Sequence, residues 1–154
     1  QLDFQLPQSF ELEYTDADGM KKRPIMIHRA GFGSFERFIG MLTEQYAGKF
    51  PTWLSPCQVK VLPVSEKHRE YARGVYDALR AAGIRAKIDE RDEKIGYKIR
   101  EARSADRVPY MLILGEKEAE ANNISVRDRS NETHQATLED FVTEITAEIR
   151  DRRG

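Results

Sequence analysis

The fold class follows from residues 58–89, which read QVKVLPVSEKHREYARGVYDALRAAGIRAKID. Gln58–Val64 has the apolar character of a buried strand, and Ser65 can cap the helix that follows it. That helix carries apolar residues on one face and is predicted to end at Gly83. Because Ile84–Asp89 predicts a second strand, the stretch is typical of an α/β domain with a mainly parallel sheet.

Further strands and helices continue this alternation toward the C-terminus. We predict a basic helix from about Lys94 to Arg103, a strand at Val108–Leu114 and a fourth strand at Ile124–Arg127. Thr137 begins an acidic variant of the capping box, which predicts a last helix. The expected architecture is therefore α/β, with a mixed, mainly parallel sheet flanked by helices.

The first part of the chain has a different pattern. Gln1–Leu6 and Phe10–Tyr14 alternate apolar and polar residues, as strands do. The Asp and Gly residues of Thr15–Gly19 predict a hairpin turn, and Arg23–Arg29 is the expected returning strand. We therefore expect antiparallel strands here.

A helix with one apolar stripe follows, and the pattern breaks after it. Gly48 is predicted to end this helix, and Pro51 and Pro56 mark a boundary. The predicted organisation is residues 1–50 as one domain, 51–56 as a linker and 57–154 as a second domain. The apolar stripe consists of Phe35, Phe38, Ile39, Leu42 and Tyr46.

The composition excludes some classes of protein. Charged residues make up 33% and apolar residues 40%, which is typical of a folded, soluble domain. The net charge of −1 gives no general attraction to nucleic acid, so a nucleic-acid site would have to be a local patch. The single cysteine, Cys57, cannot form an internal disulfide, and we expect a cytoplasmic protein. No apolar run is long enough to predict a membrane helix or a membrane partner.

One segment has the pattern of a ligand-binding turn. Met26–Phe38 reads MIHRAGFGSFERF, a short strand, a glycine-containing turn and the start of a helix. Gly31 and Gly33 let the backbone turn sharply or approach a ligand, and the helix N-terminus offers free N–H groups. Arg37 lies one turn into the helix and can reach a phosphate or a carboxylate. From the pattern alone, an ordinary turn before an amphipathic helix is the more frequent meaning.

Residues Gly33–Arg37 resemble the end of the third signature motif of class II aminoacyl-tRNA synthetases. His28-Arg29-Ala30 and the opening Gln1–Phe4 resemble the threonine-specific members of that class. The resemblance implies that Arg37 is the catalytic arginine that binds ATP. It also implies further ATP-site residues, Gly33 and Glu36, and two residues that face the substrate, Gln1 and Ser34.

The same resemblance implies a metal role for His28. In the threonine-specific family the matching histidine is one of three protein ligands of a zinc ion, which would hold the amino and hydroxyl groups of threonine. The other two ligands, a cysteine and a histidine, lie far upstream in the family. Cys57, His68 and His134 match neither of them. We therefore expect this chain alone to bind no zinc tightly.

Three stretches resemble the anticodon-binding domain that several class II synthetases share: Arg91–Glu101, Val108–Glu118 and Val126–Arg129. Unpaired bases are recognised by hydrogen bonds to their edges, for which carboxylates, arginines and lysines are suited. The resemblance implies that the anticodon is bound by Asp92, Lys94, Glu118, Arg127 and Arg129.

Together these resemblances imply the C-terminal part of a threonine-specific synthetase. Its parent would use ATP with Mg²⁺ to activate threonine, transfer it to tRNA(Thr) and form a homodimer, and we expect the fragment alone to be inactive. The alternative is a non-catalytic RNA-binding accessory module. Two departures favour it slightly: Gly31-Phe32 replaces two bulky aliphatic residues, and Asp92 replaces an asparagine.

Overall fold

The computed structural model describes residues 1–153, which form two compact units with the boundary after Met41. We call residues 1–41 unit 1 and residues 42–153 unit 2. Among the described residues, no helix is long and apolar enough to cross a membrane.

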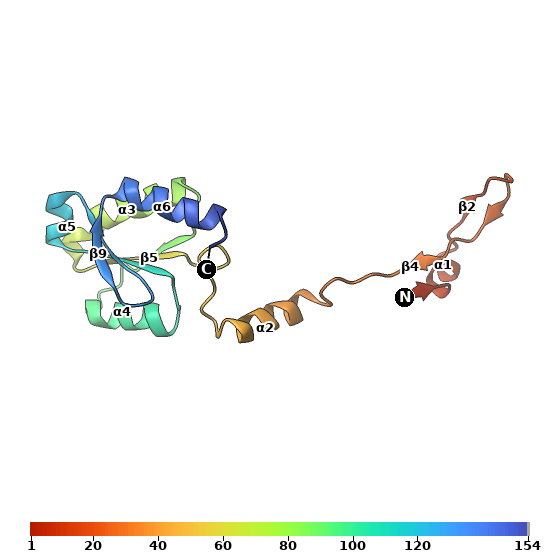
Figure 1. Ribbon diagram of the computed structural model, residues 1–154, viewed down its shortest axis with the longest axis horizontal. Helices are drawn as coiled ribbons and strands as arrows, with labels where there is room; N and C mark the ends of the chain where they lie inside the picture. Colours follow the sequence, from red (N-terminus) through yellow and green to blue (C-terminus); the bar gives the residue numbers. More distant parts are fainter. Residues whose placement is uncertain (154) are drawn as a thin grey trace. The chain divides into compact units, whose positions relative to one another are not determined.

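Unit 1 contains two separate antiparallel strand pairs (Figure 1). β1 (Leu2–Asp3) pairs with β4 (Met26–Ile27), and β2 (Tyr14–Thr15) pairs with β3 (Lys21–Lys22). The prediction of antiparallel strands is confirmed, and the turn between β2 and β3 lies where it was expected.

The predicted strand Phe10–Tyr14 is wrong before Tyr14, because the N–H groups of Phe10 and Glu11 donate to nearby backbone oxygens in a turn. The predicted returning strand Arg23–Arg29 is also wrong: β3, which precedes this range, closes the hairpin, and within the range only β4 is a strand, which pairs with β1.

The predicted strand Gln1–Leu6 is wrong beyond Asp3. The chain enters helix α1 (Gln5–Ser9) instead. The Asp3 carboxylate accepts the N–H groups of Gln5 and Leu6 at 2.9 and 3.0 Å, which starts a helical turn. This local hydrogen bonding overrides the alternating pattern.

Unit 1 has no apolar core of its own. Pro7 is its one buried residue, and large apolar side chains such as Phe4 and Ile27 are exposed. Helix α2 (Phe35–Gln45) forms as predicted and crosses the boundary between the units. Phe35 and Ile39 on its apolar stripe are 83% and 58% exposed.

Unit 2 is built on a five-stranded mixed sheet with the order β6-β5-β7-β8-β9. Strand β5 is parallel to β6 and β7, whereas β8 is antiparallel to both of its neighbours. The expected α/β architecture with a mixed sheet is confirmed. The strands are β5 (Val59–Pro63), β6 (Ala86–Ile88), β7 (Tyr110–Leu114), β8 (Ile124–Arg127) and β9 (Thr133–Ala136).

Helices cover the two faces of this sheet unequally. Figure 1 shows α3 (Arg69–Ala81) and α6 (Leu138–Arg150) on one face and α4 (Ile95–Ser104) on the other. The first face holds the larger core, which includes Val61, Leu79, Leu112, Val126 and Phe141. On the second face, a smaller cluster of Leu62, Ala102, Val108 and Met111 holds α4 against the sheet. A short 3-10 helix, Glu66–His68, precedes α3.

Two elements of unit 2 were not predicted. Helix α5 (Glu116–Ala121) has only six residues, and β9 has the polar sequence Thr-His-Gln-Ala. Strand β9 exists because its backbone pairs with β8, which a polar edge strand can do without apolar side chains. The predicted linker, residues 51–56, lies inside unit 2, where Thr52 and Ser55 are buried.

Replacing Leu112 by alanine tests the core of unit 2. Leu112 is 0% exposed in the central part of the sheet, so Leu112→Ala should lower the free energy of unfolding by about 2–5 kcal/mol. Val64→Ala, at a position that is 41% exposed, is the control and should cost less than about 1 kcal/mol. Urea titration followed by the fluorescence of Trp53, the single tryptophan, reports on unit 2. Equal losses in the two variants would contradict the assigned core.

Candidate nucleic-acid interface

Strands β8 and β9 carry a row of polar side chains beside α4. Ile124 and Val126 point into the core under α3 and α6, so Ser125 and Arg127 face the α4 side. The cross-strand partners of Ser125 and Arg127 are Gln135 and Thr133, and they share that face. We call these four residues, Ser125, Arg127, Thr133 and Gln135, the β8–β9 track.

Hydrogen bonds fix the orientation of the track. Arg127 Nε donates to Thr133 Oγ1 at 2.9 Å, which leaves the terminal nitrogens of the guanidinium available. Gln135 Nε2 donates to Glu118 Oε1 at 3.2 Å, and Gly115 N–H donates to Glu118 Oε2 at 2.9 Å. Glu118 therefore adjoins the track, and one contact is used on each of its two oxygens.

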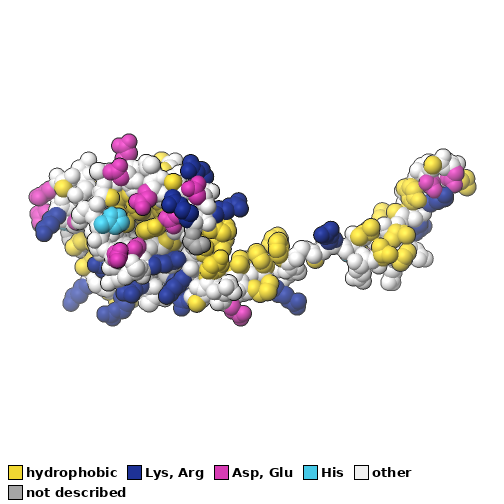
Figure 2. All heavy atoms as spheres, viewed as in Figure 1, with side chains coloured by type: hydrophobic (Ala, Val, Ile, Leu, Met, Phe, Trp, Pro, Cys, Tyr) yellow, Lys and Arg dark blue, Asp and Glu magenta, His cyan; other side chains and the backbone are white. Residues whose placement is uncertain are grey.

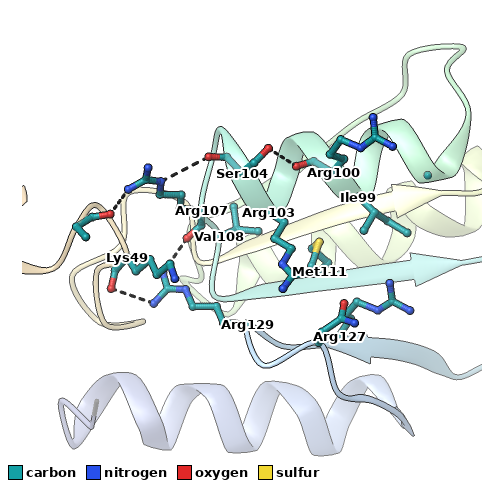
Figure 3. Close-up of a pocket in the computed structure, with 13 residues that line it drawn as sticks. Lys49, Ile99, Arg100, Arg103, Ser104, Arg107, Val108, Met111, Arg127 and Arg129 are labelled. Atoms are coloured by element: carbon teal, nitrogen blue, oxygen red, sulfur yellow. Dashed lines mark hydrogen bonds between the residues drawn. The ribbon is translucent and has the colours of Figure 1, made fainter.

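A cavity of about 700 Å³ opens between α4 and this part of the sheet (Figure 3). Ile99, Val108 and Met111 contribute apolar side chains to it. Its lining contains one lysine, five arginines and no acidic residue: Lys49, Arg100, Arg103, Arg107, Arg127 and Arg129. We call this cavity the cationic pocket.

Two of these arginines hold the pocket together. Arg129 donates to the backbone oxygens of Lys49 and Arg107 at 3.2 and 2.8 Å. Arg107 donates to the backbone oxygens of Ala47 and Ser104. Partial burial lowers the pKa of the Arg129 guanidinium from its usual value, and its Nε is buried without a partner among the described residues. These arginines thus join three segments that form one wall.

Three further cations of the lining have no internal contacts in the part of the chain that the structure describes. The side chains of Lys49, Arg100 and Arg103 are exposed and make no hydrogen bond or ion pair with the described residues. Gly96 lies one helical turn before Arg100, and a Cβ atom added there would meet nothing within 4 Å. The pocket is therefore open toward the N-terminal end of α4.

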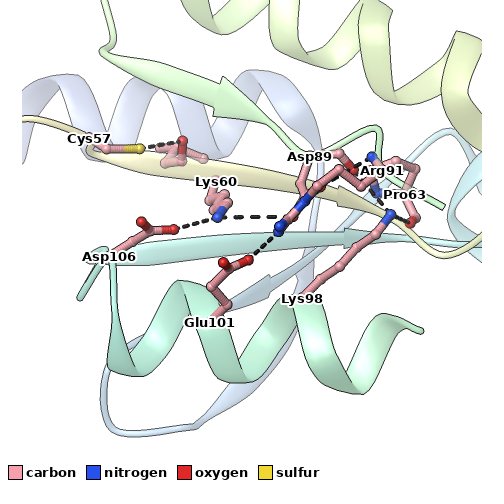
Figure 4. A network of polar contacts seen from close by, with 9 residues as sticks. Cys57, Lys60, Pro63, Asp89, Arg91, Lys98, Glu101 and Asp106 are labelled. Carbon is pink, nitrogen blue, oxygen red and sulfur yellow. Dashed lines mark hydrogen bonds and ion pairs between the residues drawn. The ribbon is translucent and has the colours of Figure 1, made fainter. Parts of the chain in front are cut away.

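A polar network beneath α4 fixes the helix and the loop before it (Figure 4). Arg91 donates to both carboxylate oxygens of Asp89 at 2.9 and 2.6 Å and also contacts Glu101 of α4. The Arg91 guanidinium holds the pKa of Asp89 below its usual range. The amino group of buried Lys98 donates to the backbone oxygens of Asp89 and Pro63 at 3.1 and 3.4 Å.

The five anticodon residues implied by the resemblance fall into two groups. Asp92 and Lys94 follow β6, and Glu118 follows β7, so these three come from the same edge of the sheet, where parallel strands end. Arg127 and Arg129 line the cationic pocket. Asp92 and Lys94 are exposed, and their side chains make no hydrogen bond or ion pair with described residues.

Sequence reasoning missed five residues of this region: Lys49, Arg100, Arg103, Thr133 and Gln135. The spacing of Gly96, Arg100 and Arg103 on one face of a predicted helix was an available signal. Thr133 and Gln135 gave no signal, because β9 was not predicted.

In unit 1 the strand pairing brings Gln1 and His28 together. The His28 N–H donates to the Gln1 oxygen at 2.9 Å, and the Gln1 amine donates to the His28 oxygen at 3.1 Å. His28 Nε2 lies 2.8 Å from Asp3 Oδ2. Among residues 1–153, no three His, Cys, Asp or Glu side chains lie close enough to hold a metal ion. The residues present therefore do not by themselves fit a zinc site.

The other predicted residues of unit 1 lie at the start of α2. Gly33 has a φ of +72°, in the left-handed region that favours glycine. Ser34 Oγ accepts the N–H of Arg37 at 3.3 Å and so caps the helix. The side chains of Glu36 and Arg37 are exposed in the first turn.

Comparison with known proteins identifies the family to which this chain belongs. The family model described as "Anticodon binding domain" matches residues 58–148, which include most of unit 2 and the whole sheet. The chain belongs to the anticodon-binding domain family. The match contains the β8–β9 track and all of the cationic pocket except its Ala47–Lys49 wall.

Individual relatives agree with this assignment. The chain is 57% identical over 150 residues to the threonine–tRNA ligase of Caldanaerobacter subterraneus subsp. tengcongensis, a match that spans 97% of this chain and 23% of that protein. It is 56% identical over 155 residues to that of Clostridioides difficile strain 630, spanning 100% of this chain and 24% of the relative. The chain thus spans about a quarter of the length of these curated relatives.

Two solved structures share the fold. The RNA-binding domain of threonyl-tRNA synthetase from Cryptosporidium parvum Iowa II matches with a TM-score of 0.72 and 39% identity, over 96% of this chain and 37% of that one. Prolyl-tRNA synthetase from Cryptosporidium parvum, complexed with halofuginone and AMPPNP, matches with a TM-score of 0.68 over 94% of this chain and 31% of that one. At 20% identity, the second match indicates a common fold only.

Replacing Arg129 tests its role in joining the pocket wall. Arg129→Met removes two hydrogen bonds to backbone oxygens and should lower the free energy of unfolding by about 1–3 kcal/mol. Arg100→Met removes an equally long cation without internal partners and should change it by less than about 0.5 kcal/mol. Urea titration followed by Trp53 fluorescence measures both. If Arg129→Met left the free energy of unfolding unchanged, this arginine would not hold the wall.

The lowered pKa of Asp89 predicts an effect of acid on stability. Its carboxylate stabilises the fold fully above the ordinary aspartate pKa of about 4, and this contribution is lost as the pH falls through the lower folded value. Asp89→Asn should therefore be less stable than the parent at pH 7 but should lose less stability between about pH 5 and 2. Urea titrations of both proteins across that pH range measure this. If the free energy of unfolding fell equally in the parent and in Asp89→Asn, ionised Asp89 would not stabilise the fold.

Proposed function

We propose that unit 2 binds the anticodon loop of tRNA(Thr) and that the chain is the C-terminal part of a threonine–tRNA ligase. The observation that carries the proposal is the cationic pocket next to the β8–β9 track, in a chain of the anticodon-binding domain family. The high sequence identity to threonine–tRNA ligases supports threonine as the amino acid that the parent enzyme uses. The relatives are about four times longer, so the activity of the whole protein belongs to this proposal.

The chemistry of the surface suits an unpaired loop. Glu118 can accept hydrogen bonds from base amino groups, and Gln135 beside it can donate or accept. Arg127 keeps its terminal nitrogens for a base edge or a phosphate. Lys94 can reach a phosphate or a base acceptor, whereas the Asp92 carboxylate can only accept. Arg129 holds the pocket wall with two of its donors and also lines the pocket, where it can meet the RNA.

For the first part of the chain we propose a share of the catalytic site. In this assignment residues 1–50 belong to the catalytic domain, 51–56 connect it and 57–154 form the anticodon-binding domain. Arg37, Gly33 and Glu36 would bind ATP, which acts with Mg²⁺, and the exposed first turn of α2 leaves them accessible. The parent would act as a cytoplasmic homodimer.

Gln1, Ser34 and His28 would face threonine and its zinc ion. The pairing of Gln1 with His28 supports a common site for these two residues. His28 would supply one ligand, and the others would come from parts of the parent outside this chain. We therefore keep the expectation that the chain alone neither binds zinc tightly nor catalyses aminoacylation.

A non-catalytic RNA-binding module is the second candidate. Asp92 favours it, because a carboxylate cannot donate to a base acceptor as the family's asparagine can. Both candidates require RNA binding by unit 2. They differ in whether the full-length parent forms threonyl-tRNA, and formation of the product would exclude the second.

Anticodon recognition can be tested with the 154-residue chain and two stem-loop RNAs, one with a threonine anticodon and one with a scrambled loop. The chain should bind the first more tightly at fixed salt. Arg127→Ala should weaken binding of the threonine-type loop by about 1–3 kcal/mol, because a base contact is lost. It should weaken binding of the scrambled loop much less. Fluorescence anisotropy measures both affinities.

Lys117→Ala is the matched control for charge. Lys117 is exposed on α5 and does not line the pocket, so its replacement should leave the preference between the two RNAs unchanged. Equal losses for both RNAs in Arg127→Ala would reduce Arg127 to a phosphate contact. If the parent chain bound both RNAs equally, the anticodon proposal itself would fail.

A further inference from the structure

We infer that the cationic pocket receives one unstacked nucleotide of the RNA loop, with the Arg103 guanidinium lying against its base. This inference rests on the proposed RNA-binding function and names a residue that the family resemblance did not assign. It concerns the pocket itself and not the Asp92, Lys94 and Glu118 edge.

The lining of the pocket selects for a ligand with both a planar apolar part and negative charge. Ile99, Val108 and Met111 offer apolar surface that a bare phosphate or a carboxylate cannot use. The six cations and the lack of acidic residues in the lining favour an anion. A nucleotide combines a ring with a phosphate, and the volume of about 700 Å³ is within the usual range of small-ligand sites.

Arg103 is the side chain best placed to contact the ring. Figure 3 shows it reaching from α4 toward Met111, over the apolar part of the pocket. Its guanidinium makes no hydrogen bond or ion pair with the described residues, so no internal contact must break when a ligand enters. Planar guanidinium groups stack on unpaired bases, which an ammonium group does less well.

Lys49 and Arg100 can hold the phosphate groups on either side of this nucleotide. Both are exposed, and both lack internal partners among the described residues. Figure 2 shows Lys and Arg side chains gathered along the side of unit 2 that carries α4. In Figure 3 Arg100 points outward from the helix, so it would reach the backbone of the RNA and not the ring.

A double-mutant cycle between the protein and the RNA tests the inference. The threonine-type stem-loop is made as a set in which one loop nucleotide at a time is abasic, and each is bound to the parent chain, Arg103→Lys and Arg100→Lys at one salt concentration. At one loop position the parent should lose about 5- to 100-fold in affinity when the base is removed, the scale of a stacking contact. Arg103→Lys should lose less than about twofold from the same removal, because the stacking partner is already gone.

Arg100→Lys is the matched control on the same helix. It keeps the charge, as Arg103→Lys does, and should retain the full sensitivity of the parent to the abasic position. Both positions are exposed, and unfolding curves that match the parent check that the variants fold. The result that overturns the inference is independence, in which Arg103→Lys and every abasic substitution weaken binding by factors that multiply.

The inference would also be overturned if the parent chain bound every abasic RNA as tightly as the intact loop. Failure of the proposed function is a separate outcome, since it appears as equal binding of the intact cognate and scrambled loops by the parent chain. A preference for the cognate loop without coupling to Arg103 would leave anticodon recognition standing and remove the nucleotide from this pocket.

Discussion

The register between β7 and β8 determines which side chains of unit 2 can meet a ligand. Arg127 lies opposite Met111, and Ser125 lies opposite Ile113. Because side chains alternate along a strand, this register places Ile124 and Val126 in the core and Arg127 next to α4. A shift by one residue would bury Arg127 among apolar side chains and expose Val126, so the apolar core and the polar face beside α4 both depend on the same register.

The two sides of α4 explain how a chain with a net charge of −1 forms a pocket in which every charged lining residue is a cation. Three acidic residues near α4 are paired beneath the helix, where Asp89 and Glu101 contact Arg91 and Asp106 contacts Lys60. The opposite side carries Arg100 and Arg103 without acidic partners. These three acids are therefore paired with other cations and do not line the pocket, which leaves its cations without acidic partners among the described residues.

The sequence predicted the parts of this structure in which side chains alone determine the outcome. The apolar run of β5 and the amphipathic pattern of α3 and α6 identified the core, and the capping residue Thr137 marked the start of α6. It did not predict β9, whose polar residues are ordered by backbone pairing with β8. It also failed at Gln1–Leu6, where the Asp3 carboxylate bonds two backbone N–H groups and begins α1.

The predicted functional residues show the same contrast between what the sequence indicates and what only the fold determines. The resemblance implied Arg127 and Glu118, whose neighbours in sequence are distinctive; Arg127 belongs to the track and Glu118 adjoins it. It could not distinguish Arg129, which donates to two backbone oxygens, from an arginine without internal partners. That distinction depends on the fold, since the partners of Arg129 are separated from it by 80 and 22 residues in the chain.

The small number of free cations also bears on how such a site would distinguish one RNA from another. Among the described residues, the side chains of Lys49, Arg100 and Arg103 make no hydrogen bond or ion pair and that of Arg127 makes one hydrogen bond, whereas Arg107 and Arg129 each donate to two backbone oxygens. Four phosphate contacts to a single strand would give a slope of only about −3 when the logarithm of the binding constant is plotted against the logarithm of the salt concentration. RNA binding with so few ionic contacts would have to draw a large share of its free energy from the bases. The apolar surface of Met111 and the hydrogen-bonding groups of the track are the parts of unit 2 able to supply it.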